Sequence, residues 1–193
     1  MKIACIGTGF VGVVTTAVFA SHGHEVAGLD IDENKVASLS KGQVPFFEPG
    51  LNELLNKTLV SGNLTFTTSY QEAITDAEII LIMVGTPSAA DGQADLKYVL
   101  ATAESMAPYL KEDAIVVIKS TVPPGTNKKI EKILKQKAKV SFTTASVPEF
   151  LREGTAVEDT LHPSRVVIGS TNKKAADKLA QLHRPLSDRI IVM

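Results

Sequence analysis

Three glycines stand between an apolar run and a helical stretch in the sequence Gly7-Thr8-Gly9-Phe10-Val11-Gly12. Glycines at this spacing permit a tight turn, close approach of a pyrophosphate to the backbone, and close packing of helix on strand. The helix that follows then offers free N–H groups and a partial positive charge to phosphates. A glycine turn alone is a common connector, but in this context it predicts a dinucleotide-binding turn in which Gly7, Gly9, Phe10, Val11 and Gly12 contact the cofactor.

Asp30 supplies the acid that such a turn requires. It ends the second apolar run and follows Gly12 at the expected distance of about 20 residues. A carboxylate there accepts hydrogen bonds from the ribose hydroxyls and repels a 2′-phosphate, which favours NAD over NADP. Lys35 lies one helical turn farther on and is a second candidate ribose contact; the alternative is a solvated lysine.

Polar loops follow three other apolar runs. Residues 79–84 precede Gly85-Thr86-Pro87, residues 115–119 precede a loop that begins with Ser120 and Thr121, and residues 140–144 precede the segment 148–154. Each loop alone is more simply a connector. Because ligands of open α/β sheets bind outside the carboxyl ends of the strands, three such loops on one edge predict a ligand crevice.

Together these motifs resemble the UDP-glucose/GDP-mannose dehydrogenase family. The matching segments occur in the family's order, cover essentially the whole chain, and read GTGFVG (7–12), EPGL (48–51), VGTP (84–87), KSTVP (119–123), PEFLREGTA (148–156) and HPSRVVIG (162–169).

The resemblance implies oxidation of a sugar-nucleotide primary alcohol to a carboxylate, with two NAD molecules and a covalent thioester. UDP-glucose is the expected sugar nucleotide, and GDP-mannose or UDP-N-acetylmannosamine is the alternative. Glu149 is implied as the general acid/base acting through water, and Thr121 helps to hold that water. The implied NAD contacts are Asp30, Lys35, Thr86, Ser120, Thr121 and Glu153. The implied substrate contacts are Glu149, Phe150, Leu151, Arg152 and Glu153, and a shared helix face would join Glu149 to Glu153 if that stretch is helical.

Two departures from the family pattern bear on the site. Val147 stands where the family usually has Asn before Pro-Glu-Phe, which leaves the placement of Glu149 open. The family's nucleophilic cysteine, with its lysine and asparagine partners, belongs to later segments. Cys5 is no substitute, because it lies within the first expected strand and should be a buried, inert thiol. We therefore expect the chain to bind NAD without turnover, and to be monomeric although the full-length family enzyme forms homodimers.

Apolar runs alternate with helical stretches along the chain, which predicts a Rossmann-type, doubly wound α/β fold with a mostly parallel sheet. One NAD-binding domain is expected over residues 1–193. The expected strands are 3–6, 25–29, 64–67, 79–84, 115–118, 139–144, 165–168 and 189–192. The expected helices are 11–20, 33–40, 51–60, 96–110, 127–136 and 173–182.

Composition excludes several classes of function. The net charge is −1 with no basic stripe, which argues against a nucleic-acid partner, and no run is long enough to cross a membrane. A single cysteine fits a reducing cytoplasm, and His22 and His24 have no further ligands nearby, so no metal is expected. A non-catalytic NAD-binding or redox-sensing module stays open because fold does not fix function, but the acidic segment 148–154 argues against it.

Overall fold

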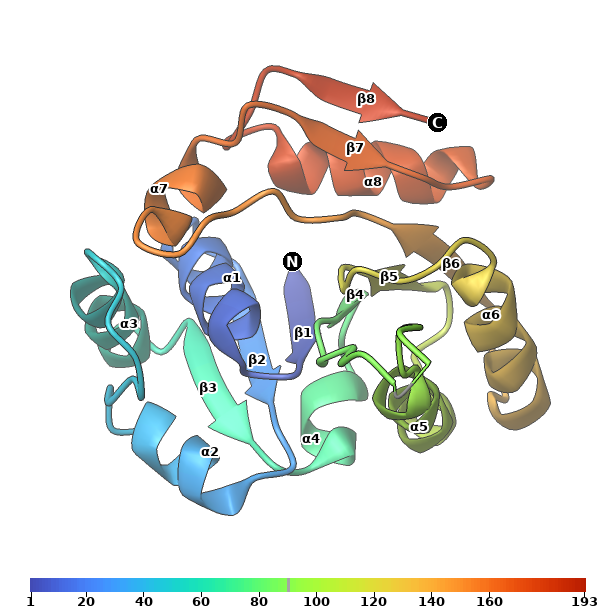
Figure 1. Ribbon diagram of the computed structural model, residues 1–193, viewed down its shortest axis with the longest axis horizontal. Helices are drawn as coiled ribbons and strands as arrows, with labels where there is room; N and C mark the ends of the chain where they lie inside the picture. Colours follow the sequence, from blue (N-terminus) through green and yellow to red (C-terminus); the bar gives the residue numbers. More distant parts are fainter. Residues whose placement is uncertain (90) are drawn as a thin grey trace.

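A six-stranded parallel sheet lies at the centre of the protein, as seen in the computed structural model, which describes residues 1–89 and 91–193 (Figure 1). Its strand order is β3-β2-β1-β4-β5-β6. The order reverses direction between β1 and β4, which is the switch point where doubly wound sheets bind ligands. The strands are β1 Lys2–Ile6, β2 Glu25–Leu29, β3 Leu64–Thr67, β4 Ile79–Ile82, β5 Ala114–Ile118 and β6 Phe142–Ser146.

Helices cover both faces of this sheet (Figure 1), and two hydrophobic clusters mark the two interfaces. One cluster joins the sheet to α1, α3, α7 and α8, and the other joins it to α4, α5 and α6. The helices are α1 Phe10–Ser21, α2 Glu33–Leu39, α3 Leu51–Val60, α4 Tyr70–Ile74, α5 Lys97–Met106, α6 Thr126–Lys137, α7 Ala156–Leu161 and α8 Lys173–His183, with a short 3-10 turn at Ala107–Tyr109.

The predicted doubly wound α/β fold is confirmed, and the apolar runs explain why. Every residue of β4 and β5 is buried, as expected of central strands covered on both faces. The last two expected strands, however, do not join this sheet. They form a separate parallel pair, β7 Val166–Ile168 with β8 Ile190–Val192, and α8 lies between this pair and the main sheet (Figure 1).

Several boundaries differ from the sequence-based expectation. Strand β6 begins three residues later than predicted, and β4 ends two residues earlier, at Ile82. Helices α4 and α7 were not predicted, because five and six residues are too few to show a helical period. The segment 148–154 is not helical, so the shared helix face proposed for Glu149 and Glu153 is wrong.

The turn from β1 to α1 depends on close backbone contacts at two of its glycines. Gly7 has φ +94°, and a Cβ there would lie 2.8 Å from the carbonyl oxygen of Met83. A Cβ on Gly12 would lie only 1.9 Å from the carbonyl oxygen of Gly7. Nothing lies within 4 Å of a Cβ built on Gly9, so that glycine leaves open space above the turn.

Within the described part of the chain, no helix is both long and apolar enough to cross a membrane.

We predict different stability effects for two glycine substitutions in this turn. Gly12→Ala forces a methyl group into the Gly7 carbonyl and should lower the free energy of unfolding by about 1–3 kcal/mol. Gly9→Ala meets no neighbour and should stay within about 1 kcal/mol of the parent. Urea unfolding of both variants tests this, and equal losses of stability would contradict the described turn.

Candidate functional site

The Asp30 carboxylate ties the end of β2 to the glycine turn. Its Oδ2 accepts hydrogen bonds from the backbone N–H and the hydroxyl of Thr8, both at 2.9 Å. Lys35 Nζ donates to the same oxygen at 2.9 Å, so the lysine is paired rather than freely solvated. Oδ1 accepts only the N–H of Asp32, at 3.2 Å, among the described residues. Since a carboxylate has about four acceptor sites, Oδ1 keeps capacity for a ligand hydroxyl.

The charge on Asp30 is maintained despite its burial. Burial by itself raises the pKa of this carboxyl, because it disfavours the charged form. The hydrogen bonds from Lys35, Asp32 and Thr8 outweigh burial and hold the pKa below its ordinary value. Asp30 is therefore an anion with its position fixed before any ligand arrives.

A cavity of about 360 Å³ opens beside this carboxylate, and we call it the Asp30 cavity. Its walls come from the glycine turn, the end of β2, the start of α2 and one face of α5. The lining residues are Ile6, Gly7, Gly9, Leu29, Asp30, Ile31, Lys35, Tyr70, Met83, Val84, Gly85, Tyr98, Ala101, Thr102 and Ser105. Mostly apolar walls with one anion at the end suit a flat aromatic base attached to a sugar.

A second cavity, of about 270 Å³, adjoins the first, and we call it the Glu149 cavity. It is lined by Gly9, Phe10, Val11, Met83, Val84, Gly85, Thr86, Lys119, Ser120, Thr121 and Glu149. The two cavities share Gly9, Met83, Val84 and Gly85. They form one crevice along the carboxyl ends of the strands, with the start of α1 between its two halves.

Hydrogen bonds between loops set the shape of the Glu149 cavity. The Thr86 hydroxyl donates to the backbone oxygen of Thr121 at 2.9 Å. The Ser120 hydroxyl donates to the backbone oxygen of Val84 at 2.8 Å. Because both bonds join the loop after β4 to the loop after β5, they hold the two loops at a fixed separation.

Helix α1 presents its N-terminus to this crevice. Its N-cap is Gly9, which has no side chain that could accept from the first-turn N–H groups, and the first turn carries no acidic residue. The amides of this turn and the helix dipole are arranged for an anion. With Asp30 at one end and open space over Gly9, the residues present fit a dinucleotide pyrophosphate.

The loop after β6 carries the predicted acid/base. Glu149 lines the Glu149 cavity, and its Oε2 accepts the Leu151 N–H at 2.9 Å. Val147, which departs from the family pattern, is buried, and its N–H donates to the Ile118 carbonyl at 3.1 Å. The backbone hydrogen bond and the buried side chain of Val147 therefore fix the start of the loop that carries Glu149.

Glu48 is a positioning residue that the sequence reasoning did not single out beyond the EPGL motif. Its buried carboxylate accepts the Gly154 N–H at 2.8 Å and the Ala156 N–H at 2.7 Å. Both amides belong to the end of the segment 148–156, so Glu48 fixes the C-terminal end of that segment. The distance of over 100 residues between the partners hides this contact from any local pattern.

The structure does not bring every predicted site residue into the crevice. Arg152 and Glu153 are exposed and line neither cavity. The Arg152 guanidinium instead donates to both carboxylate oxygens of Asp159, at 2.8 and 3.0 Å. Phe150 lies against the Arg165 guanidinium, 4.4 Å from the ring centroid. Phe150 and Leu151 line a separate, inner cavity described below.

Cys5 is buried within β1, as predicted, and burial raises the pKa of its thiol. A thiol without exposure cannot meet a substrate carbon. Among the described residues, no group of three or more His, Cys, Asp or Glu side chains is arranged to hold a metal ion.

Comparison with known proteins gives a consistent result. Residues 1–187 match the NAD binding domain of the UDP-glucose/GDP-mannose dehydrogenase family. A UDP-glucose 6-dehydrogenase of Bacillus subtilis is 46% identical over 187 residues, covering 96% of this chain and 42% of that protein. The chain thus spans less than half the length of such curated relatives.

Solved structures agree with this match. A UDP-glucose dehydrogenase from the archaeon Pyrobaculum islandicum superposes with a TM-score of 0.96 at 41% identity, over 99% of this chain and 45% of that one. GDP-mannose dehydrogenase from Pseudomonas aeruginosa superposes with a TM-score of 0.92 at 36% identity, over 100% of this chain and 46% of that one.

We predict that Glu48→Gln loosens the segment 148–156. Glutamine keeps one acceptor and sets its NH₂ group against a backbone N–H, which should cost about 1–3 kcal/mol of unfolding free energy. Urea unfolding and limited proteolysis of this segment measure the effect. Glu53→Gln, on the exposed face of α3, is the matched control; equal behaviour of the two variants would refute the role given to Glu48.

Proposed function

This chain belongs to the UDP-glucose/GDP-mannose dehydrogenase family, as its NAD-binding domain, and we propose that it serves the oxidation of UDP-glucose to UDP-glucuronate. The observation that carries the proposal is the single crevice with a ribose acid, Asp30, at one end and a free carboxylate edge, Glu149, at the other. The enzyme that contains this domain would be a cytoplasmic biosynthetic enzyme that acts on a small-molecule substrate.

When bound, NAD would accept the hydride, and the residues of this chain would bind and orient it. Asp30 Oδ1 is the acceptor for the adenosine ribose hydroxyls, and the first-turn amides at Phe10 and Val11 meet the pyrophosphate. Lys35 neutralises part of the Asp30 charge and holds the carboxylate in place. Thr86, Ser120 and Thr121 line the far half of the crevice, where the nicotinamide ring would lie.

Glu149 and Thr121 are the groups we assign to proton chemistry. The two residues line the same cavity, and one Glu149 oxygen accepts no hydrogen bond from the described residues. A carboxylate with a free oxygen can accept a proton from water, and a nearby hydroxyl can orient that water. The overall oxidation converts one primary alcohol and one water into a carboxylate; two hydrides pass to two NAD molecules and three protons are released.

Substrate contacts are assigned to the segment from Glu149 to Glu153. Phe150 is almost half exposed, and Arg152 and Glu153 are exposed and lie outside the crevice. We assign Glu153 to the substrate side more readily than to NAD, because it lines neither cavity of the crevice. The GDP-mannose dehydrogenase relative, at 36% identity, supports a GDP-sugar as the alternative substrate.

The first test of the cofactor assignment is discrimination between NAD and NADP. The chain should bind NAD more tightly in calorimetric titration, because the Asp30 carboxylate repels a 2′-phosphate. Asp30→Ala should weaken NAD binding by about 10- to 100-fold, the size of a hydrogen bond to a charged group. Asp32→Ala, at the exposed N-cap of α2, is the control, and equal affinity for NAD and NADP would remove the case for Asp30.

The second test concerns the nucleophile of the oxidation. Purified chain mixed with UDP-glucose and NAD should produce no NADH absorbance, because Cys5 is fully buried and its thiol pKa is raised. The family's two-step oxidation proceeds through a thioester, which this thiol cannot form. Steady NADH production that Cys5→Ser abolishes would show that Cys5 is the nucleophile and would contradict this expectation.

A further inference from the structure

Lys119 is a buried lysine between two cavities. It directly follows β5, is 9% exposed, and its backbone N–H donates to the Ile82 carbonyl at 3.0 Å. No described residue accepts a hydrogen bond from its Nζ or forms an ion pair with it. Its side chain lines both the Glu149 cavity and a second, inner cavity. A buried ammonium without a protein partner needs water or an anion to solvate it.

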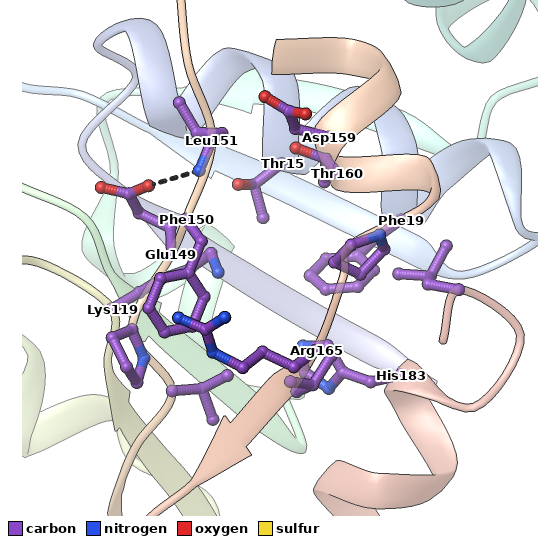
Figure 2. A pocket seen from close by; sticks show the side chains of 15 residues that line it. Thr15, Phe19, Lys119, Glu149, Phe150, Leu151, Asp159, Thr160, Arg165 and His183 are labelled. Carbon is purple, nitrogen blue, oxygen red and sulfur yellow. Dashed lines mark hydrogen bonds between the residues drawn. The ribbon is translucent and has the colours of Figure 1, made fainter. Parts of the chain in front are cut away.

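The inner cavity lies behind the segment that carries Glu149 (Figure 2). It has a volume of about 40 Å³ and is lined by residues of α1, α7, α8 and the segment from Val147 to Leu151. A water molecule needs about 10–15 Å³ of such space together with two to four polar partners. The volume is therefore sufficient for water and too small for a sugar or a nucleotide.

The Thr15 hydroxyl is an independent sign that this cavity is wet. Thr15 lies in the middle of α1, is fully buried, and lines the cavity (Figure 2). Its Oγ1 has no hydrogen-bond partner among the described residues. Leaving a buried hydroxyl unsatisfied costs about 1–3 kcal/mol, so a water at this position would be stabilising.

His183 adds an acceptor to the same cavity wall. Its Nδ1 lies 2.8 Å from the Leu179 carbonyl, so Nδ1 must carry the proton and Nε2 is left as an acceptor. Burial, followed by the nearby Lys119 charge, lowers the pKa of His183 to about 4, so the ring is neutral at pH 7. A water that accepts a hydrogen bond from the Lys119 ammonium could therefore donate one to His183 Nε2.

We propose that Lys119 is a positioning residue for Glu149, held as a hydrated ammonium between the two cavities so that its charge acts on the Glu149 carboxylate. Water in the inner cavity would join Lys119 Nζ to Thr15 Oγ1 and His183 Nε2. The proposal rests on the acid/base role assigned to Glu149 above.

The other charged groups around Lys119 leave Glu149 as its counter-charge. In the inner cavity wall, Asp159 is paired with Arg152, and Arg165 lies against the Phe150 ring. The Cys5 thiol and His183 are neutral near pH 7. Burial, opposed by the nearby Glu149 carboxylate, leaves the pKa of Lys119 lowered to about 8. Lys119 and Glu149 both line the inner cavity and the Glu149 cavity, which places the two charges beside the same water-accessible space.

The test is an NMR titration of the chain labelled with ¹³C-lysine. The Lys119 signal is assigned as the one absent from Lys119→Arg, and it should titrate near pH 8, apart from the exposed lysines. Glu149→Gln should move this midpoint downward by on the order of one pH unit. Glu153→Gln removes an exposed carboxylate of the same segment and should leave the midpoint in place. Equal effects of the two substitutions, or a Lys119 midpoint at the ordinary lysine value, would overturn the proposal.

A crystal structure at high resolution supplies a second measurement. It should show ordered water within hydrogen-bond distance of both Thr15 Oγ1 and Lys119 Nζ, and a dry cavity would contradict the proposal. Calorimetry with NAD on the same samples separates the two hypotheses. Normal NAD binding with an uncoupled Lys119 defeats the positioning role alone, whereas absent NAD binding with intact coupling defeats the proposed function.

Discussion

The hydrogen bonds between Asp30 and Thr8 are the constraint on which the site depends. They join the end of β2 to the glycine turn that follows β1, so the Asp30 carboxylate and the amides at the start of α1, the two groups proposed to bind ribose and pyrophosphate, are held together. The backbone bond from Gly7 to the Leu29 carbonyl, at 2.8 Å, reinforces the same junction. A dinucleotide needs its two recognition points at a fixed separation, and here that separation is set by the sheet.

The parallel sheet also positions the rest of the crevice. Because β1, β4 and β5 are adjacent and parallel, the loops that follow them meet at one edge of the sheet. The loop after β6 comes from the edge of the sheet and receives additional support from Glu48, a residue of the distant segment before α3. The Glu149 end of the crevice therefore depends on a contact across more than 100 residues, whereas the Asp30 end depends on contacts between neighbouring strands about 20 residues apart.

The sequence predicted the features that depend on local chemistry. The glycine turn, Asp30, and the strands β2 and β3 were placed at their observed positions, because their residue types allow few other conformations. The separate β7–β8 pair and the path of residues 148–154 were not predicted, because each is decided by tertiary packing. Lys119 and Glu48 belong to the motifs KSTVP and EPGL, but their residue types there predict no particular role. Their importance comes from burial and from partners in other segments, which periodicity does not reveal.

The most direct test of the account is a crystal structure of the chain with NAD bound. The account predicts the pyrophosphate against the amides at the start of α1, the adenosine ribose within hydrogen-bond distance of Asp30 Oδ1, and the Thr8–Asp30 bonds retained. NAD seated elsewhere, or an Asp30 carboxylate that keeps only its internal partners while NAD occupies the crevice, would contradict it.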